Sequence, residues 1–290
     1  MLFEDAAERY LAEKGKRLRA TTMEGYESAV RRHLMPRWAG TRLEDIDPDA
    51  IQEWVDSFEL PGAAEKAYKT LRQIIRWSIR KLRVRMWDPT TAEVELPRRP
   101  AYRPRVLSAR EERELLKGVY GAPFEAVVLC AAALGLRRCE ACALEWGDVD
   151  FRSGRVHVAR GAHVVRGEEV VTPPKTALSD RVLVLPSFAL RRLRQIAAGR
   201  RRGRMCAMRP DQVARALRSW CRRRALPWVP MQSLRHSWAT ISIGHGVPLE
   251  DVALCLGHSS QDTCYEHYLV RTGEICRRAS RGYAEAIMAA

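Results

Sequence analysis

The spacing of apolar side chains in the first 85 residues predicts a group of amphipathic helices. The clearest helix covers residues 63–85, where apolar side chains recur every three or four positions and line one side: Leu71, Ile74, Ile75, Ile79 and Leu82. Asp47 followed by Pro48 predicts a further helix start, because aspartate accepts hydrogen bonds from the first helical amides and proline suits the first turn. Thr21 and Glu24 have the spacing of a capping box and predict another start.

The pattern changes after residue 105. Ser108 and Glu111 form a second capping-box pair, and an apolar run predicts a buried helix over residues 124–136. Stretches rich in β-branched residues then predict a three-stranded sheet with a turn at Arg166 and Gly167, over residues 156–158, 164–172 and 182–185. Helical spacing returns over residues 187–198, 211–224, 233–244, 249–256 and 274–288.

Residues 89–105 separate these two patterns. Prolines interrupt both helix and strand there, at positions 89, 97, 100 and 104. We therefore expect a helical domain over residues 1–88, a basic, proline-rich linker over residues 89–105 and a second domain over residues 106–290. The expected fold class is mostly α with a small antiparallel β-sheet, which makes the second domain mixed α/β.

Charge is distributed unevenly along the chain. The formal net charge is +15 at pH 7, yet residues 1–100 hold 19 Lys and Arg against 17 Asp and Glu. Residues 191–224 hold thirteen arginines and a single acid, Asp211. A run of one sign repels itself unless an anion neutralises it, which favours nucleic acid as the partner. A solvated basic surface is the alternative that charge alone leaves open.

A second basic feature lies on the predicted helix over residues 63–85 and in the linker. The cations of the helix advance by three or four positions, so they share one face away from the apolar side. The candidate DNA contacts are Lys69, Arg72, Arg76 and Arg80 on the helix and Arg98, Arg99 and Arg103 in the linker. Proline favours extended backbone, so the linker suits a segment that follows a duplex while its arginines contact phosphates.

The sequence argues against secreted and membrane proteins. The opening residues carry early acids and no apolar core of a signal peptide. The longest apolar stretch, residues 126–136, is too short to span a bilayer. We therefore expect a cytoplasmic protein without a membrane partner, in which the eight cysteines are mostly reduced. Four residues have the spacing of zinc ligands, which keeps a zinc-stabilised binding module as an alternative, although no metal is the preferred expectation: Cys255, His258, Cys264 and His267.

Five residues in the second half of the chain suit one reaction, the attack of a tyrosine on a phosphodiester. Arg137 stands in "LGLRRCE", Lys175 in "TPPKTALSDR", Arg235 in "SLRHSWAT", and His258 and Tyr268 in "LGHSSQDTCYEHY". Arginine can grip non-bridging phosphate oxygens bidentately, where transition-state charge accumulates. Tyrosine can hold the broken strand as a covalent ester. The order and context of these segments resemble the tyrosine recombinase (phage integrase) family of site-specific DNA recombinases.

The resemblance covers almost the whole chain and implies a role for each residue. It implies an N-terminal helical core-binding domain and a C-terminal catalytic domain in which Arg137 and Arg235 clamp the scissile phosphate. His258 then supplies a further hydrogen bond, Lys175 protonates the departing 5′ oxygen, and Tyr268 forms a 3′-phosphotyrosine without cofactor or metal. Taken alone, Arg137 would be interpreted as a cap for helix carbonyls and Lys175 as an exposed hairpin lysine.

Two positions bear on the nucleophile and its activation. Tyr265 competes with Tyr268 as the nucleophile, but Tyr268 lies ten residues after His258, a spacing that the family uses. Gln232 stands three residues before Arg235, where the family normally has histidine. Glutamine can hydrogen-bond a phosphate oxygen but cannot accept a proton near neutral pH, so the step that activates tyrosine is the one affected. A catalytically weakened DNA-binding relative is therefore an alternative function.

The resemblance also implies partners. Double-stranded DNA is the expected substrate, and a homo-tetramer on paired DNA sites is the expected assembly. DNA-bending or excision factors are expected accessories, and a mobile element is the expected source of the target. A relaxing type IB topoisomerase shares the chemistry without joining two duplexes, and is a further alternative.

Overall fold

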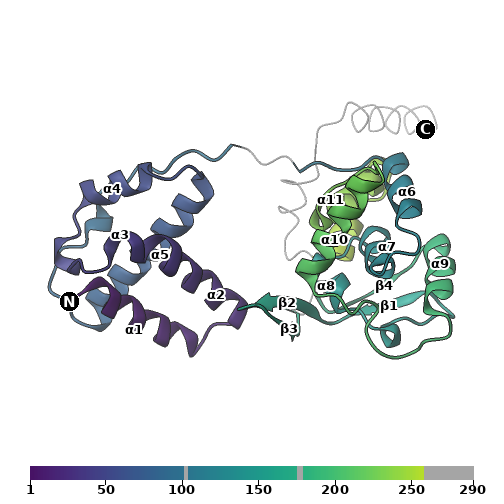
Figure 1. Ribbon diagram of the computed structural model, residues 1–290, viewed down its shortest axis with the longest axis horizontal. Helices are drawn as coiled ribbons and strands as arrows, with labels where there is room; N and C mark the ends of the chain where they lie inside the picture. Colours follow the sequence, from purple (N-terminus) through teal and green to yellow (C-terminus); the bar gives the residue numbers. More distant parts are fainter. Residues whose placement is uncertain (101–103, 175–178, 258–290) are drawn as a thin grey trace, which may run out of the picture. The chain divides into compact units, whose positions relative to one another are not determined.

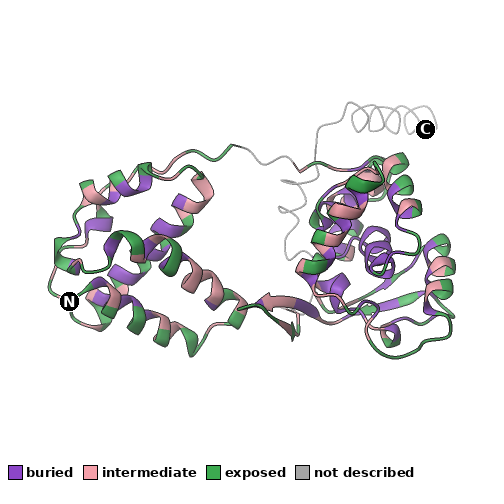
Figure 2. Ribbon diagram, in the orientation of Figure 1, coloured by how far each residue is buried: buried purple, intermediate pink, exposed green. Residues whose placement is uncertain are grey.

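The computed structural model describes residues 1–100, 104–174 and 179–257, and the chain folds into two compact units, Met1–Arg103 and Pro104–Ala290 (Figure 1). Each unit has its own buried core, visible as the purple segments in Figure 2. The chain is mostly helical, with short antiparallel strands only in the second unit among the described residues, which confirms the predicted fold class. None of the described helices combines the length and the apolar character that crossing a membrane requires.

The first unit is built from helices. They are α1 (Phe3–Gly15), α2 (Ala20–Ala29), a π-helical turn (Val30–Leu34) that continues into α3 (Met35–Trp38), α4 (Pro48–Asp56) and α5 (Pro61–Lys81), with short 3-10 turns at Leu43–Asp45 and Pro89–Thr91. Asp47 caps α4 as predicted, since its side chain accepts a hydrogen bond from the amide of Ala50 at 2.8 Å. The predicted capping box at Thr21 is wrong: Arg19 is the extended residue before α2, so Thr21 already lies inside the helix.

Helix α5 is the long amphipathic helix that the sequence predicts, although it begins at Pro61 and ends at Lys81. Its buried side includes Leu71, Ile74 and Ile75, which belong to the core of the first unit. The first half of the predicted linker also contacts this unit. Gln52 of α4 exchanges two hydrogen bonds with the backbone of Glu95, at 2.9 and 3.1 Å.

The second unit encloses α7 (Glu125–Leu134), every residue of which is buried. Around it lie α6 (Ala109–Gly118), α8 (Arg138–Ala143), α9 (Ser187–Ala197) and α11 (Met231–Gly244). Two helices lie further out: α10 (Pro210–Arg223) contacts α8, whereas α12 (Leu249–Leu256) contacts α11. The predicted capping box at the start of α6 is present, because Ser108 and Glu111 bond reciprocally. The helices predicted between residues 187 and 256 are all present, with bounds within two residues of the prediction.

The strands form two separate pairs, so the predicted three-stranded sheet is wrong. β1 (Arg155–Val158) pairs with β4 (Arg181–Val184), and β2 (Gly161–Val165) pairs with β3 (Glu168–Thr172), both antiparallel. The chain leaves the first pair after Val158 and starts the hairpin at Gly161, which separates the two ladders. The predicted turn at Arg166 and Gly167 is correct: both residues have positive φ, at 50° and 84°, as a two-residue hairpin turn requires.

Candidate active site

The site begins where α7 ends. Gly135 terminates α7 in the left-handed conformation, with φ at 62°. A Cβ atom there would lie 2.8 Å from Trp238 and 3.0 Å from Leu256, so glycine is required by both its backbone angle and its surroundings. The chain can therefore turn sharply into α8, with Arg137 as the residue that precedes the helix.

Arg137 and Glu140 close the first turn of α8 on each other. The amide of Arg137 donates to one carboxylate oxygen of Glu140 at 2.9 Å, and its guanidinium donates to the other at 2.8 Å. The Glu140 side chain is only 8% exposed, whereas that of Arg137 is 33% exposed. A buried anion thus anchors both the backbone amide and the guanidinium of Arg137, and about a third of its side chain remains exposed.

Arg235 reaches the same carboxylate from α11. It is among the largest fully buried side chains of the described residues, at 1% exposure. Its guanidinium donates to the carbonyl of Gly135 at 3.1 Å and to the carbonyl of Leu256 at 2.7 Å, and it lies 4.0 Å from Glu140. The structure therefore brings Arg137 and Arg235 together, as the family resemblance implies.

Arg181, at the start of β4, completes the cluster, and the sequence reasoning missed it. Arg181 forms an ion pair with Glu140 at 3.0 Å, and both side chains are only 8% exposed. It is the shortest ion pair of Glu140 in which both partners are buried. Burial alone would raise the pKa of Glu140, but the hydrogen bond and charge of Arg181, together with those of Arg137, outweigh it and lower that pKa. The only local signal was an arginine six residues after Lys175, and nothing in the sequence pattern marks that arginine as buried.

The three arginines share a second target, the end of α12. Arg181 donates to the carbonyl of Cys255 at 2.7 Å, Arg235 to that of Leu256, and Arg137 to that of Gly257 at 3.5 Å. A helix leaves its last carbonyls without helical partners and carries partial negative charge there, so cations stabilise this end. The next residue in the chain is His258. The cluster therefore holds the backbone that leads directly into the predicted histidine.

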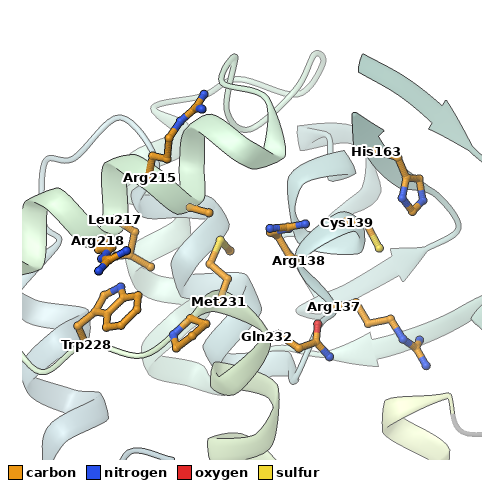
Figure 3. Close-up of a pocket in the computed structure, with 12 residues that line it drawn as sticks. Arg137, Arg138, Cys139, His163, Arg215, Leu217, Arg218, Trp228, Met231 and Gln232 are labelled. Atoms are coloured by element: carbon orange, nitrogen blue, oxygen red, sulfur yellow. The ribbon is translucent and has the colours of Figure 1, made fainter. Parts of the chain in front are cut away.

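A hollow of about 560 Å³ opens beside this cluster (Figure 3). Arg137 and Gln232 both line it, with further residues from α8, β2, α10, the segment that joins α10 to α11, and the start of α11: Arg138, Cys139, His163, Ala214, Arg215, Leu217, Arg218, Trp228, Pro230 and Met231. Gln232 is exposed at the start of α11, and Arg235 lies one turn further along the same helix. The exposed part of Arg137 and the amide of Gln232 therefore border one basic cavity.

Three of the predicted catalytic residues lie outside the described residues: Lys175, His258 and Tyr268. Lys175 follows β3 and precedes β4 in the chain, so it falls in a connection between two strands. Tyr265 and most of the alternative zinc quartet also lie outside that part, and Cys255 is the quartet member that the structure places. Within residues 1–100, 104–174 and 179–257, no three metal-binding side chains gather in one place.

The predicted DNA contacts of the first unit are exposed, and several have acidic partners. On α5, Lys69 pairs with Glu65, while Arg76 pairs with Asp88 at 3.1 Å. Arg99 pairs with the same Glu65 at 2.8 Å and donates to the carbonyl of Gly62. Arg72, Arg80 and Arg98 are exposed as well, and Arg103 lies outside the described residues.

The arginine run at residues 191–224 has a partly structural role. Arg192 forms a bidentate pair with Glu125, and Arg204 does the same with Glu169. Arg194 donates to the carbonyl of Phe151, and Arg224 lies 3.6 Å from the ring centre of Trp220. Several of these arginines therefore bind carboxylates, carbonyls or rings of the protein itself. The sequence alone had suggested that the run binds an external anion.

The second unit gathers an excess of positive charge around one carboxylate, beside a hollow, and such an arrangement suits the binding of a phosphodiester. Comparison with known proteins identifies the family. Residues 105–272 match the phage integrase family, and residues 2–58 match the phage integrase N-terminal SAM-like domain. The chain belongs to the phage integrase family and is a tyrosine-type site-specific DNA recombinase.

Individual relatives are more distant. The chain is 25% identical to the putative prophage phiRv2 integrase of Mycobacterium tuberculosis (strain ATCC 25618 / H37Rv), over 91% of this chain and 74% of that protein. It is 27% identical to the tyrosine recombinase XerC of Myxococcus xanthus, over 88% of this chain and 80% of that protein. Its fold is similar to the Tn1549 transposon integrase in complex with a circular intermediate DNA, with a TM-score of 0.81, 14% identity and coverage of 98% and 99%. A lambda integrase tetramer bound to a Holliday junction is also similar, with a TM-score of 0.67, 14% identity and coverage of 91% and 77%.

Proposed function

We propose that this recombinase cuts and rejoins double-stranded DNA through a 3′-phosphotyrosine at Tyr268, in the service of a mobile element. The observation that carries the proposal is the cluster of Arg137, Arg181 and Arg235 around Glu140. Three cations and one anion leave a net charge of +2 beside a hollow that Arg137 lines. A phosphodiester gains negative charge as a nucleophile attacks it, so this excess of positive charge suits its transition state.

The roles are those that the family resemblance implies, and the positions of Arg137 and Arg235 support two of them. Arg137 lines the hollow and binds a non-bridging oxygen of the scissile phosphate. Arg235 is buried behind it, where it holds the end of α12 and adds positive charge. His258, directly after α12, donates a further hydrogen bond, and Lys175 protonates the departing 5′ oxygen. Tyr268 attacks phosphorus, so the oxygen of its side chain forms the new bond as the bond to the 5′ oxygen breaks. The phosphotyrosine ester conserves the energy of the broken phosphodiester bond, and rejoining therefore needs neither metal nor ATP.

The partners are part of the same proposal. The basic face of α5 and the linker arginines hold the duplex through phosphate contacts. A homo-tetramer on two paired sites carries out the exchange, as strand exchange between duplexes needs four cleavages. DNA-bending or excision factors assist in bringing the two sites together.

A nicked suicide substrate tests this function. A nick near the cleavage point lets the 5′ fragment diffuse away, so the protein should be trapped on DNA in the presence of EDTA. Tyr268→Phe should abolish trapping but keep DNA binding, because it removes only the nucleophilic oxygen. Tyr265→Phe is the matched control and should still trap. An adduct that survives in the Tyr268 variant and disappears in the Tyr265 variant would contradict our choice of nucleophile.

A second candidate function rests on Gln232. It is exposed and lines the same hollow as Arg137, where the family normally presents histidine. Without a proton acceptor at that position, the chain would bind DNA and cleave it slowly or not at all. Absence of any adduct on a DNA site to which the protein demonstrably binds would favour this weakened relative over an active recombinase.

A further inference from the structure

Gln73 on α5 is held by two tyrosine hydroxyls from neighbouring helices. The hydroxyl of Tyr10 in α1 donates to Oε1 of Gln73 at 2.6 Å, and the hydroxyl of Tyr26 in α2 donates to the same atom at 3.1 Å. Tyr10 is 1% exposed, and its burial, with a smaller effect of Tyr26, raises its pKa. Tyr10 therefore stays a protonated donor throughout the physiological pH range.

This arrangement fixes which part of the amide is available to a ligand. A carbonyl oxygen has two lone pairs, and the two tyrosines occupy both. The amide nitrogen carries two N–H donors, and it has no hydrogen-bond partner among the described residues. Gln73 is itself exposed. The side chain therefore presents two donors to solvent and has no acceptor left to offer.

Cations flank Gln73 on both sides. It is the residue shared by two hollows of about 380 and 490 Å³ on the surface of the first unit. The first hollow is bordered by Lys14, Arg76 and Arg80 with one acid, Glu13, and the second by Lys66, Lys69 and Arg99 with one acid, Glu65, so cations outnumber acids in both. Lys14 is also held in place, with Nζ 5.4 Å from the ring centre of Tyr10 and 5.9 Å from that of Tyr26. Positive charge on either side of an oriented polar group suits a groove of duplex DNA, whose phosphates position the protein and whose bases specify it.

We propose that Gln73 is a specificity-determining residue that reads guanine in the major groove, an inference that rests on the DNA recombinase function above. Guanine presents two acceptors there, O6 and N7, which match the two N–H donors of a fixed amide. Adenine is the usual partner of glutamine, but it offers one acceptor and one donor and so needs a free Oε1. Because Tyr10 and Tyr26 occupy Oε1, the preference turns from adenine to guanine.

The first experiment compares modified DNA sites. The preferred site of the full chain is selected from random duplexes, and each guanine in it is replaced singly by 7-deazaguanine, which lacks the N7 acceptor. At one position the substitution should weaken binding of the wild-type protein about tenfold, the scale of a lost base contact. The same substitution should have no effect on Gln73→Ala. Arg72→Gln is the matched control, because loss of an exposed cation on the same helix should weaken binding to all sequences alike.

The second experiment changes the orienting tyrosines. Tyr10→Phe with Tyr26→Phe frees Oε1 while keeping both rings, so adenine should now be accepted at the position where guanine was preferred. Gln73→Glu keeps the acceptor for both tyrosines but removes the donors, and should lose the preference for guanine. Equal effects of 7-deazaguanine on wild type and Gln73→Ala at every position would overturn the proposal, as would unchanged guanine preference in the double tyrosine variant. In either case, sequence-specific binding and trapping of Tyr268 on DNA would leave the recombinase function standing.

Discussion

Replacement of Glu140 by glutamine removes the single anion among three arginines. The change is nearly isosteric, so it tests charge rather than packing. Removal of one partner from a buried ion pair costs about 3–5 kcal/mol, because the remaining charge is left uncompensated. Glu140 is 8% exposed and faces Arg181 at 3.0 Å and Arg137 at 2.8 Å. We therefore expect Glu140→Gln to lower the free energy of unfolding by about 4 kcal/mol, within that range.

Glu65 supplies a matched control in the same chain. It also accepts from two cations, Lys69 and Arg99, but its side chain is 27% exposed and those of its partners are 63% and 57% exposed. Water and salt screen exposed pairs of this kind, so Glu65→Gln should leave the free energy of unfolding almost unchanged. Urea unfolding of both variants at low salt measures the difference. Equal costs for the two variants would refute the argument that burial makes Glu140 critical.

The same cluster predicts a coupling between Glu140 and Arg181. In the wild-type protein, Arg181→Met should lower the free energy of unfolding by about 3 kcal/mol. This is the low end of the range for a broken buried pair, because Arg137 still pairs with Glu140. In the Glu140→Gln background it should cost almost nothing, because it removes one of three mutually repelling cations. The two unfolding series give a coupling free energy directly. Additive costs would show that Arg181 contacts Glu140 without depending on its charge.

Two further predictions concern titration and turnover. Oε2 of Glu112 is buried and has no hydrogen-bond partner among the described residues. Burial raises the pKa of Glu112 to about 7. The protein should therefore lose stability as pH rises from about 4.5 to 7, because the folded state must then hold a buried charge. Glu112→Gln should remove that loss and stabilise the protein at pH 8 by at most about 3 kcal/mol, and a pH-independent gain in urea unfolding would contradict the assignment. Gln232→His should speed DNA cleavage with little change in affinity, because it restores a proton acceptor beside Arg137. Unchanged single-turnover rates would show that the chain compensates for Gln232 elsewhere.

Local signals in the sequence predicted local structure well. Asp47, the pair Ser108 and Glu111, and the turn at Arg166 and Gly167 all depend on contacts within a few residues, and all three are confirmed. Thr21 shows the limit of such signals. A capping box works only if its first residue is extended, and here Arg19 takes that conformation, so the helix has already begun when the chain reaches Thr21.

Features that depend on distant contacts could not be predicted in the same way. The pairing of β1 with β4 rather than with the hairpin depends on where the chain bends after Val158, which no periodicity encodes. The role of Arg181 depends on a carboxylate 41 positions away. Arg137 and Arg235 were found because their local contexts resemble a known family, and the family resemblance gave no reason to consider Arg181.

The arginines of this chain show why charge counts locate a nucleic-acid surface poorly. A guanidinium has five donors in a fixed plane, so it can satisfy several backbone carbonyls at once and is stable when buried. Arg235 uses this property at the site, where it is buried and donates to two backbone carbonyls. Lysine forms a more strongly hydrated point charge and is less suited to such burial. Lys66 and Lys69, which border a hollow with Gln73, are exposed, and so are Arg215 and Arg218 of the arginine run, which line the hollow beside Arg137. The position of a cation beside a hollow therefore marks a candidate DNA surface better than the number of cations in a run.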